Sequence, residues 1–312
     1  MENSFTPPFS VTRGRFAPSP TGVLHVGNLR TALAAWLSAT SVGGEMLVRI
    51  EDLDRANSSL ENENRQLTDL LRLGVDFPRS VMRQSERFSV YDAVVDDLTA
   101  RGLTYPCFCT RREIREAASA PHGPLPDGAY SGTCRNLSPA QVNERIASGR
   151  PFAVRLRTDD ESYSFHDRMI GEVTGTVDDF VLRRNDGVPA YNLAVVVDDA
   201  AQGVTEIVRG DDLLLSTPRH LHLQRLLGHP CPEYAHVPLV LGGDGERLAK
   251  RHGAVTLDDL LALGESIASA VAVLLDSLGL PPDLDAAAAD FSWSRVPRTP
   301  WTIPERWQTR HP

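Results

Sequence analysis

Residues 14–28 read GRFAPSPTGVLHVGN and decide the fold of the chain. Residues 14–17 are typical of a short strand, and the prolines and glycine that follow allow no regular element, so a loop comes next. From Val26 to Thr40 apolar residues recur at the spacing of one helix face, and residues 46–50, MLVRI, predict a second strand. Strand, loop, helix and strand form the opening unit of a parallel sheet.

The rest of the chain predicts an α/β domain that is split by an insertion. Strands are expected at 152–157 and 180–183, and the apolar run at 193–197 is typical of a strand buried on both faces. Four segments follow from this pattern: the first half of a Rossmann-type catalytic domain, an insertion, the second half of that domain, and a loop with a short helical extension, at residues 1–106, 107–179, 180–245 and 246–312.

The composition is that of an ordinary globular protein, with 41% hydrophobic and 23% charged residues. A net charge of −9 argues against broad nonspecific binding to nucleic acid and leaves room for a local basic patch. Such a patch could lie in the tail, where arginines alternate with tryptophans, although a docked extension is the commoner use of such a tail. No leader or membrane span is visible, so we expect a cytoplasmic protein.

Two segments could bind phosphate. His25, Gly27 and Asn28 stand where the first loop becomes a helix, and a helix start presents free N–H groups and a positive dipole end. Taken alone, His25 is more often a structural residue. Lys250 is the single lysine among 32 lysine and arginine residues and lies in a glycine-flanked polar loop. Its compact ammonium suits a moving phosphate better than an arginine fork does, although one lysine could fall there by chance.

Three of the four cysteines lie close together as Cys107, Cys109 and Cys134. A C-x-C pair can chelate a tetrahedral ion, and the third thiol leaves one ligand open. His122 and Tyr130 are the candidates, and general zinc chemistry favours the histidine. Three buried thiols without metal are the alternative.

The motifs of this chain, in order, closely resemble those of glutamyl-tRNA synthetases, which are class I enzymes. Residues 14–33 resemble their N-terminal segment, residues 25–28 match the HIGH motif, and residues 247–251 match the KMSKS loop with Arg247 and Ala249 as departures. Residues 49–52, 190–199 and 205–210 extend the resemblance, which reaches about residue 255.

The resemblance implies that the enzyme activates L-glutamate with ATP and Mg²⁺. The residues implied for ATP are His25, Gly27, Asn28 and Lys250, with His25 and Lys250 as the catalytic pair. The residues implied for glutamate are Arg15, Phe16, Ala17, Pro18, Ser19, Glu51, Tyr191 and Arg209. Arg15 is expected to bind the γ-carboxylate and Glu51 the amino group, and an arginine fork suits the first task. Taken singly, each of these charged residues is more often part of a surface salt bridge.

Two features resemble the short glutamyl-Q tRNA(Asp) synthetases within this class. The pattern C-x-C…Y-x-x-x-C resembles their zinc site and implies one Zn²⁺ held by Cys107, Cys109, Tyr130 and Cys134. The stretch after Lys250 is too short for the anticodon-binding region of full-length relatives. This resemblance implies a monomer that transfers glutamate to the queuosine base of tRNA(Asp). A truncated glutamyl-tRNA synthetase charging a tRNA 3′ end, a non-catalytic ATP- or RNA-binding paralogue, and another class I nucleotidyltransferase are the alternatives.

Overall fold

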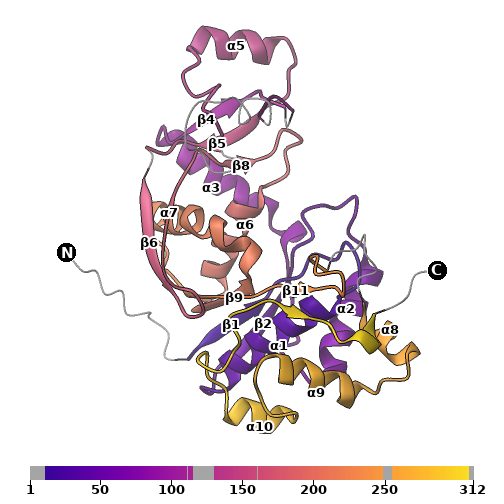
Figure 1. The fold of residues 1–312 in the computed structure, drawn as a ribbon. Coiled ribbons are helices and arrows are strands. Elements are labelled where there is room, and N and C mark those ends of the chain that lie inside the picture. The colour runs from indigo at the N-terminus through magenta and orange to yellow at the C-terminus, as the bar shows by residue number, and fades with distance from the viewer. Residues whose placement is uncertain (1–10, 111, 115–129, 160, 249–254, 309–312) are drawn as a thin grey trace.

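The computed structural model describes residues 11–110, 112–114, 130–159, 161–248 and 255–308. A parallel sheet forms the centre of the molecule (Figure 1). In it, β1 (Arg13–Phe16) pairs with β2 (Glu45–Ile50), and β2 pairs with β3 (Met82–Arg83). The helix between the first two strands, α1, spans Val26–Thr40, which are the bounds that the sequence predicts.

The second half of the sheet lies beside β1. The Thr205 N–H donates to the Arg13 carbonyl at 2.9 Å, which ties the start of β9 (Glu206–Gly210) to β1. Beyond it, β10 (Glu233–Val237) and β6 (Ser162–Asp167) continue in parallel, and β7 (Gly171–Thr176) forms an antiparallel edge on β6. The predicted α/β class with a parallel sheet is thus confirmed.

A smaller antiparallel sheet sits at one end of the molecule and consists of β4 (Thr104–Cys107), β5 (Ala153–Leu156) and β8 (Val181–Arg183). Helix α5 (Pro139–Ala147) lies at its far side (Figure 1). The strand pairing does not follow the boundary placed between residues 179 and 180. Strands β6 and β7, expected in the insertion, join the main sheet, whereas β8, expected in the main sheet, joins the small one.

The strand predicted at 193–197 is wrong, because these residues lie in a helix, α6 (Tyr191–Ala201). Every residue from Leu193 to Asp199 is buried. A helix covered on all sides shows a continuous apolar run, which periodicity alone cannot distinguish from a buried strand. Helix α6 packs with α3 (Phe88–Ala100) and β8 into a second core below the small sheet.

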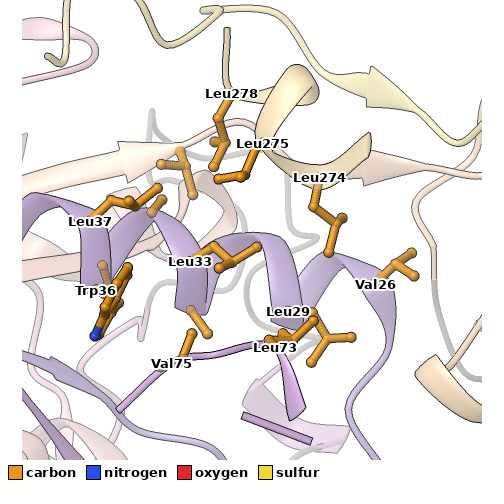
Figure 2. Packing of buried hydrophobic residues seen from close by; sticks show 14 of the residues in the cluster. Val26, Leu29, Leu33, Trp36, Leu37, Leu73, Val75, Leu274, Leu275 and Leu278 are labelled. Atoms are coloured by element: carbon orange, nitrogen blue, oxygen red, sulfur yellow. The ribbon is translucent and has the colours of Figure 1, made fainter. Parts of the chain in front are cut away.

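The main core surrounds α1, whose apolar residues point to both sides (Figure 2). Leu274, Leu275 and Leu278, in and just after α9 (Ile267–Ser277), cover one side, and Leu73 and Val75 cover the other. The C-terminal tail is docked here, since Trp307 is fully buried and its ring nitrogen donates to Glu265. The remaining helices and strands are α2 (Leu60–Arg72), η1 (Gln84–Glu86), η2 (Asp211–Ser216), α7 (Thr217–Leu227), β11 (Val240–Leu241), α8 (Leu257–Ala262), α10 (Leu284–Ala289), β12 (Trp301–Thr302) and η4 (Glu305–Trp307). Within the described ranges no helix combines the length and apolar character needed to cross a bilayer.

Candidate active site

A cavity of about 390 Å³ opens at the carboxyl ends of the parallel strands. Ligands bind at this edge in open parallel sheets, because the loops that follow the strands converge there. The cavity brings together ten of the residues predicted from the sequence: Arg15, Phe16, Ala17, Ser19, His25, Gly27, Asn28, Glu51, Tyr191 and Arg209. Pro18 lies behind the wall, where its carbonyl accepts the Glu51 N–H at 2.9 Å. Lys250 lies outside the described residues, as does His122.

The start of α1 forms one wall of the cavity. His25 caps the helix, and its Nδ1 accepts the N–H groups of Gly27 at 3.1 Å and Asn28 at 3.4 Å. Because Nδ1 accepts, the proton of the neutral ring lies on Nε2, which can donate to a ligand. Glycine at residue 27 leaves room for the His25 ring, since a Cβ there would lie 2.9 Å from His25 Cε1 and would push the ring aside.

The two described ends of the loop that contains Lys250 lie at this same wall. Leu248 lines the cavity, and the Val255 carbonyl accepts the Val26 N–H at 2.9 Å. His25 also forms a bridge with Thr256. The loop therefore leaves from the cavity and returns to the start of α1.

A buried ionic network holds the charged residues of β1 and β2. Asp199 of α6 accepts Arg49 Nη1 at 2.6 Å and lies 3.4 Å from Arg15 Nε, and Arg49 Nη2 donates to Glu51 at 3.2 Å. Burial disfavours the charged form of Arg49, but Asp199, Glu51 and Asp198 outweigh it and raise its pKa. Burial also raises the pKa of Glu51 despite the two arginines beside it.

Arg209 at the end of β9 has a different environment. Its Nε donates to His236 Nε2 at 3.0 Å, its Nη1 lies 3.2 Å from His220 Nδ1, and its Nη2 donates to Thr217 at 2.9 Å. A longer contact of 3.4 Å joins Nη1 to the Tyr191 hydroxyl. Although Arg209 is only 5% exposed, no carboxylate of the described residues lies within ion-pair distance of it. A buried guanidinium without a counter-ion is suited to an anionic ligand.

A second cavity, of about 670 Å³, adjoins the first and shares Ser19, Glu51 and Tyr191 with it. Its other polar residues come from the loops after β1 and β2, from η1, and from the small sheet and the loops beside it: Thr21, Asp54, Gln84, Thr110, Arg155, Arg184 and Asn185. Cys107 and Cys109 also reach this cavity. The two cavities therefore meet at Glu51 and Tyr191.

The three predicted cysteines come together. The sulfur atoms of Cys107, Cys109 and Cys134 lie within 4.8 Å of one another. The Tyr130 hydroxyl lies between them, 3.3 Å from Cys107 Sγ and 3.6 Å from Cys109 Sγ. Ligand atoms about 2.0–2.3 Å from a tetrahedral zinc ion are roughly 3.3–3.8 Å apart, so these four residues fit such an ion. This cluster could hold a metal.

Four functional residues were not found by sequence reasoning: Asp198, Asp199, His220 and His236. The sequence gives no role to these histidines, which are scattered along the chain. The two aspartates stood inside the motif 190–199, where their adjacent acidic side chains in an otherwise apolar run were the available signal.

This arrangement, a helix start and a charged cavity at the ends of parallel strands, is that of a nucleotide-binding α/β enzyme. A family model described as tRNA synthetases class I (E and Q), catalytic domain, matches residues 11–282. The chain belongs to this family of class I tRNA synthetases.

Individual relatives narrow the likeness. A glutamyl-Q tRNA(Asp) synthetase of Nocardia farcinica is 57% identical over 93% of this chain and 92% of its own length. A glutamate–tRNA ligase of Dichelobacter nodosus is 44% identical over 78% of this chain, but the match covers only 52% of the ligase. Among solved structures, a glutamate–tRNA synthetase of Elizabethkingia anophelis superposes with a TM-score of 0.80 at 26% identity, over 96% of this chain and 69% of that one.

Proposed function

We propose that the protein activates L-glutamate with ATP and transfers the glutamyl group to the queuosine base of tRNA(Asp). The observation that carries the glutamate assignment is the uncompensated Arg209 guanidinium, which shares a cavity with Arg15 and the Glu51 carboxylate. An acidic amino acid has a side-chain carboxylate for the arginines and an ammonium group for Glu51. The relatives that are named glutamyl-Q tRNA(Asp) synthetase and match this chain over nearly their whole length support transfer to tRNA(Asp).

The γ-carboxylate was expected to bind Arg15, and the contacts of Arg15 and Arg209 lead us to revise this assignment. Arg15 shares Asp199 with Arg49, and its Nη1 donates to the Val208 carbonyl, so part of its charge and donor capacity is used. We assign the γ-carboxylate to both arginines, with Arg209 as the main counter-ion. Tyr191 would direct its hydroxyl to the same carboxylate, and Ser19 at the mouth would contact the α-carboxylate. Phe16, Ala17 and Pro18 shape the wall.

Adenylate formation needs ATP beside the start of α1. The α-carboxylate of glutamate attacks the α-phosphorus in line, and pyrophosphate leaves. His25 Nε2, the helix N–H groups and Asn28 would stabilise the developing phosphate charge, and Gly27 permits the close approach. Lys250 is assigned to the leaving phosphates, because both described ends of its loop lie at this wall. The Mg²⁺ that accompanies ATP supplies further charge neutralisation.

Transfer needs an acceptor that reaches the glutamyl carbonyl. The second cavity opens onto the first at Glu51 and Tyr191 and is lined by polar groups on Asp54, Arg184 and Asn185. We assign this cavity to the acceptor nucleoside, whose hydroxyl attacks the adenylate while AMP leaves. The hydroxyl-bearing ring of queuosine suits the carboxylate and amide there.

We propose that Cys107, Cys109, Tyr130 and Cys134 hold one structural Zn²⁺, which fixes the loop behind the second cavity. Arg155 Cζ lies 3.7 Å from the Tyr130 ring centroid. Burial, and then the hydrogen bond with Cys107, raise the pKa of Tyr130, so a bound Zn²⁺ would itself have to displace the phenol proton. A monomeric state, a cytoplasmic location and the predicted boundary between residues 245 and 246 are also part of this proposal.

Two assays test the proposal in sequence. The first measures glutamate-dependent exchange of pyrophosphate into ATP without tRNA. The second offers labelled glutamate to tRNA(Asp) with queuosine, tRNA(Asp) without it, and tRNA(Glu). Label only on the first tRNA supports the proposal. Label on the 3′ end of tRNA(Glu) supports the second candidate function, a truncated glutamyl-tRNA synthetase that charges a tRNA 3′ end. The 44% identity to glutamate–tRNA ligases favours this candidate. ATP binding without exchange would leave a non-catalytic paralogue.

A further inference from the structure

A buried chain of hydrogen bonds runs from β6 to the first cavity. Asp167 Oδ2 lies 2.6 Å from His236 Nδ1, and His236 Nε2 accepts from Arg209 Nε at 3.0 Å. Asp167 and His236 are 0% and 1% exposed, so solvent does not compete for these bonds. This series of hydrogen bonds ends at the Arg209 guanidinium, which faces the cavity.

Arg209 dictates the protonation state of His236. A guanidinium only donates hydrogen bonds, so Nε2 of His236 must be unprotonated. The ring proton therefore lies on Nδ1, where Asp167 accepts it. Burial lowers the pKa of His236 and keeps the ring neutral despite the hydrogen bond to Asp167. A charged imidazole would set N–H against N–H and one positive charge beside another.

A second imidazole holds Arg209 in the same way. His220 Nε2 lies 2.9 Å from Asn192 Oδ1, so its proton lies there and its Nδ1 accepts from Arg209 Nη1. Burial, and then the neighbouring Arg209, lower the pKa of His220 well below its usual value. Two neutral acceptors thus fix the guanidinium from two directions. Carboxylates in their place would fix it equally well but would compete with an anionic ligand for its charge.

We propose that Asp167 and His236 are positioning residues for Arg209, and that they aim its guanidinium into the cavity while leaving its charge available to substrate. Asp167 acts by selecting the Nδ1–H tautomer of His236, and the naming of glutamate as the substrate rests on the proposed function. The charged and titratable groups that face His236 are Asp167 of β6, Arg15 of β1, Arg209 of β9, Asp211 of η2, His220 of α7 and the stacked ring of Tyr234 on β10.

Three variants test this by pyrophosphate exchange. His236→Phe removes both hydrogen bonds and is expected to raise the KM for glutamate about tenfold to a hundredfold, with the KM for ATP changed less than about twofold. His236→Gln is expected to recover part of this loss, because one amide can donate to Asp167 and accept from Arg209. Asp167→Asn keeps Oδ1 for the backbone N–H groups of Met169 and Ile170, but its amide disfavours the Nδ1–H tautomer. It is expected to raise the KM for glutamate as well.

His222→Gln is the matched control. Like His236 on β10, His222 is a buried histidine, but it lies on α7 and contacts Tyr163 and Glu161, away from the cavity. This variant is expected to keep both KM values. Thermal unfolding of every variant separates lost stability from lost positioning.

A spectroscopic measurement tests the tautomer without any assay of activity. In the unliganded wild type, proton NMR should show a low-field imidazole N–H resonance that disappears in His236→Phe, moves upfield in Asp167→Asn and persists in His222→Gln. The proposal is overturned if this resonance is absent from the wild type, or if the variants raise the KM for ATP as much as that for glutamate. Absence of exchange in the wild type with the resonance present would instead refute the proposed function.

Discussion

Asp199→Asn should destabilise the protein through the charges that it leaves behind. Asp199 is 3% exposed and forms ion pairs with Arg49 at 2.6 Å and with Arg15 at 3.4 Å. Breaking a buried ion pair costs about 3–5 kcal/mol, because the partner charge stays buried. Arg49 keeps Glu51 at 3.2 Å and Asp198 at 4.0 Å, so we expect a value near the lower end, about 3 kcal/mol. For a chain of 312 residues the entropy of unfolding corresponds to about 1.5 °C per kcal/mol, so Tm should fall by about 5 °C.

The assay is thermal unfolding monitored by circular dichroism, with urea unfolding for the free energy. Asp97→Asn is the matched control, since its ion pair with Arg101 is exposed and such pairs contribute about 0–1 kcal/mol. Equal losses of stability in the two variants would show that the buried network does not hold β1, β2 and α6 together.

The remaining predictions concern the two cavities. Gly27→Ala should displace the His25 ring, because the new Cβ would lie 3.0 Å from its Nδ1. The loss of the cap should lower the free energy of unfolding by about 1 kcal/mol and slow pyrophosphate exchange. Exchange at the wild-type rate would refute the assignment of this wall to ATP. Glutamate binding should weaken as pH falls. Burial raises the pKa of Glu51, so this side chain is protonated, and ceases to be the counter-ion of the substrate ammonium, at a higher pH than an exposed Glu side chain would be. The KM for glutamate should therefore rise as pH falls through the pKa of Glu51. Glu51→Gln should show a high KM at every pH, and a titration that persists in this variant would assign the group elsewhere. Cys109→Ser should lower the zinc content per chain and impair transfer to tRNA more than exchange, because Cys109 lines the second cavity and not the first. Lys250→Arg should lose most exchange activity, since a planar fork cannot replace a point charge, and wild-type exchange would remove Lys250 from the mechanism.

Local patterns in the sequence predict the elements that short-range physics determines. The helix predicted at about Val26 to Thr40 agrees with α1, because its apolar spacing and the glycines that end it act within a few turns. The cysteine cluster was predicted for the same reason, since C-x-C fixes two ligands at once. The ionic network was not, because Arg49 and Asp199 are separated by 150 positions and meet only once α6 packs beside β2. Residues 193–197, which lie within α6, were predicted to form a strand because full burial removes the amphipathic signal of a helix.

The arginines at the first cavity have two kinds of environment, which explains how the cavity can be stable and still attract an anion. Arg49 pairs with Glu51, Asp198 and Asp199, and Arg15 shares Asp199 with it, so both charges have carboxylates within the fold that tie β1 and β2 to α6. Arg209 carries the same charge but is held by His220, His236 and Thr217, which are neutral. These hydrogen bonds offset part of the desolvation of Arg209, but its charge has no counter-ion among the described residues until an anion enters. If every arginine were paired internally, a carboxylate ligand would have to displace a buried carboxylate of the protein, and the selectivity for an acidic substrate would be lost.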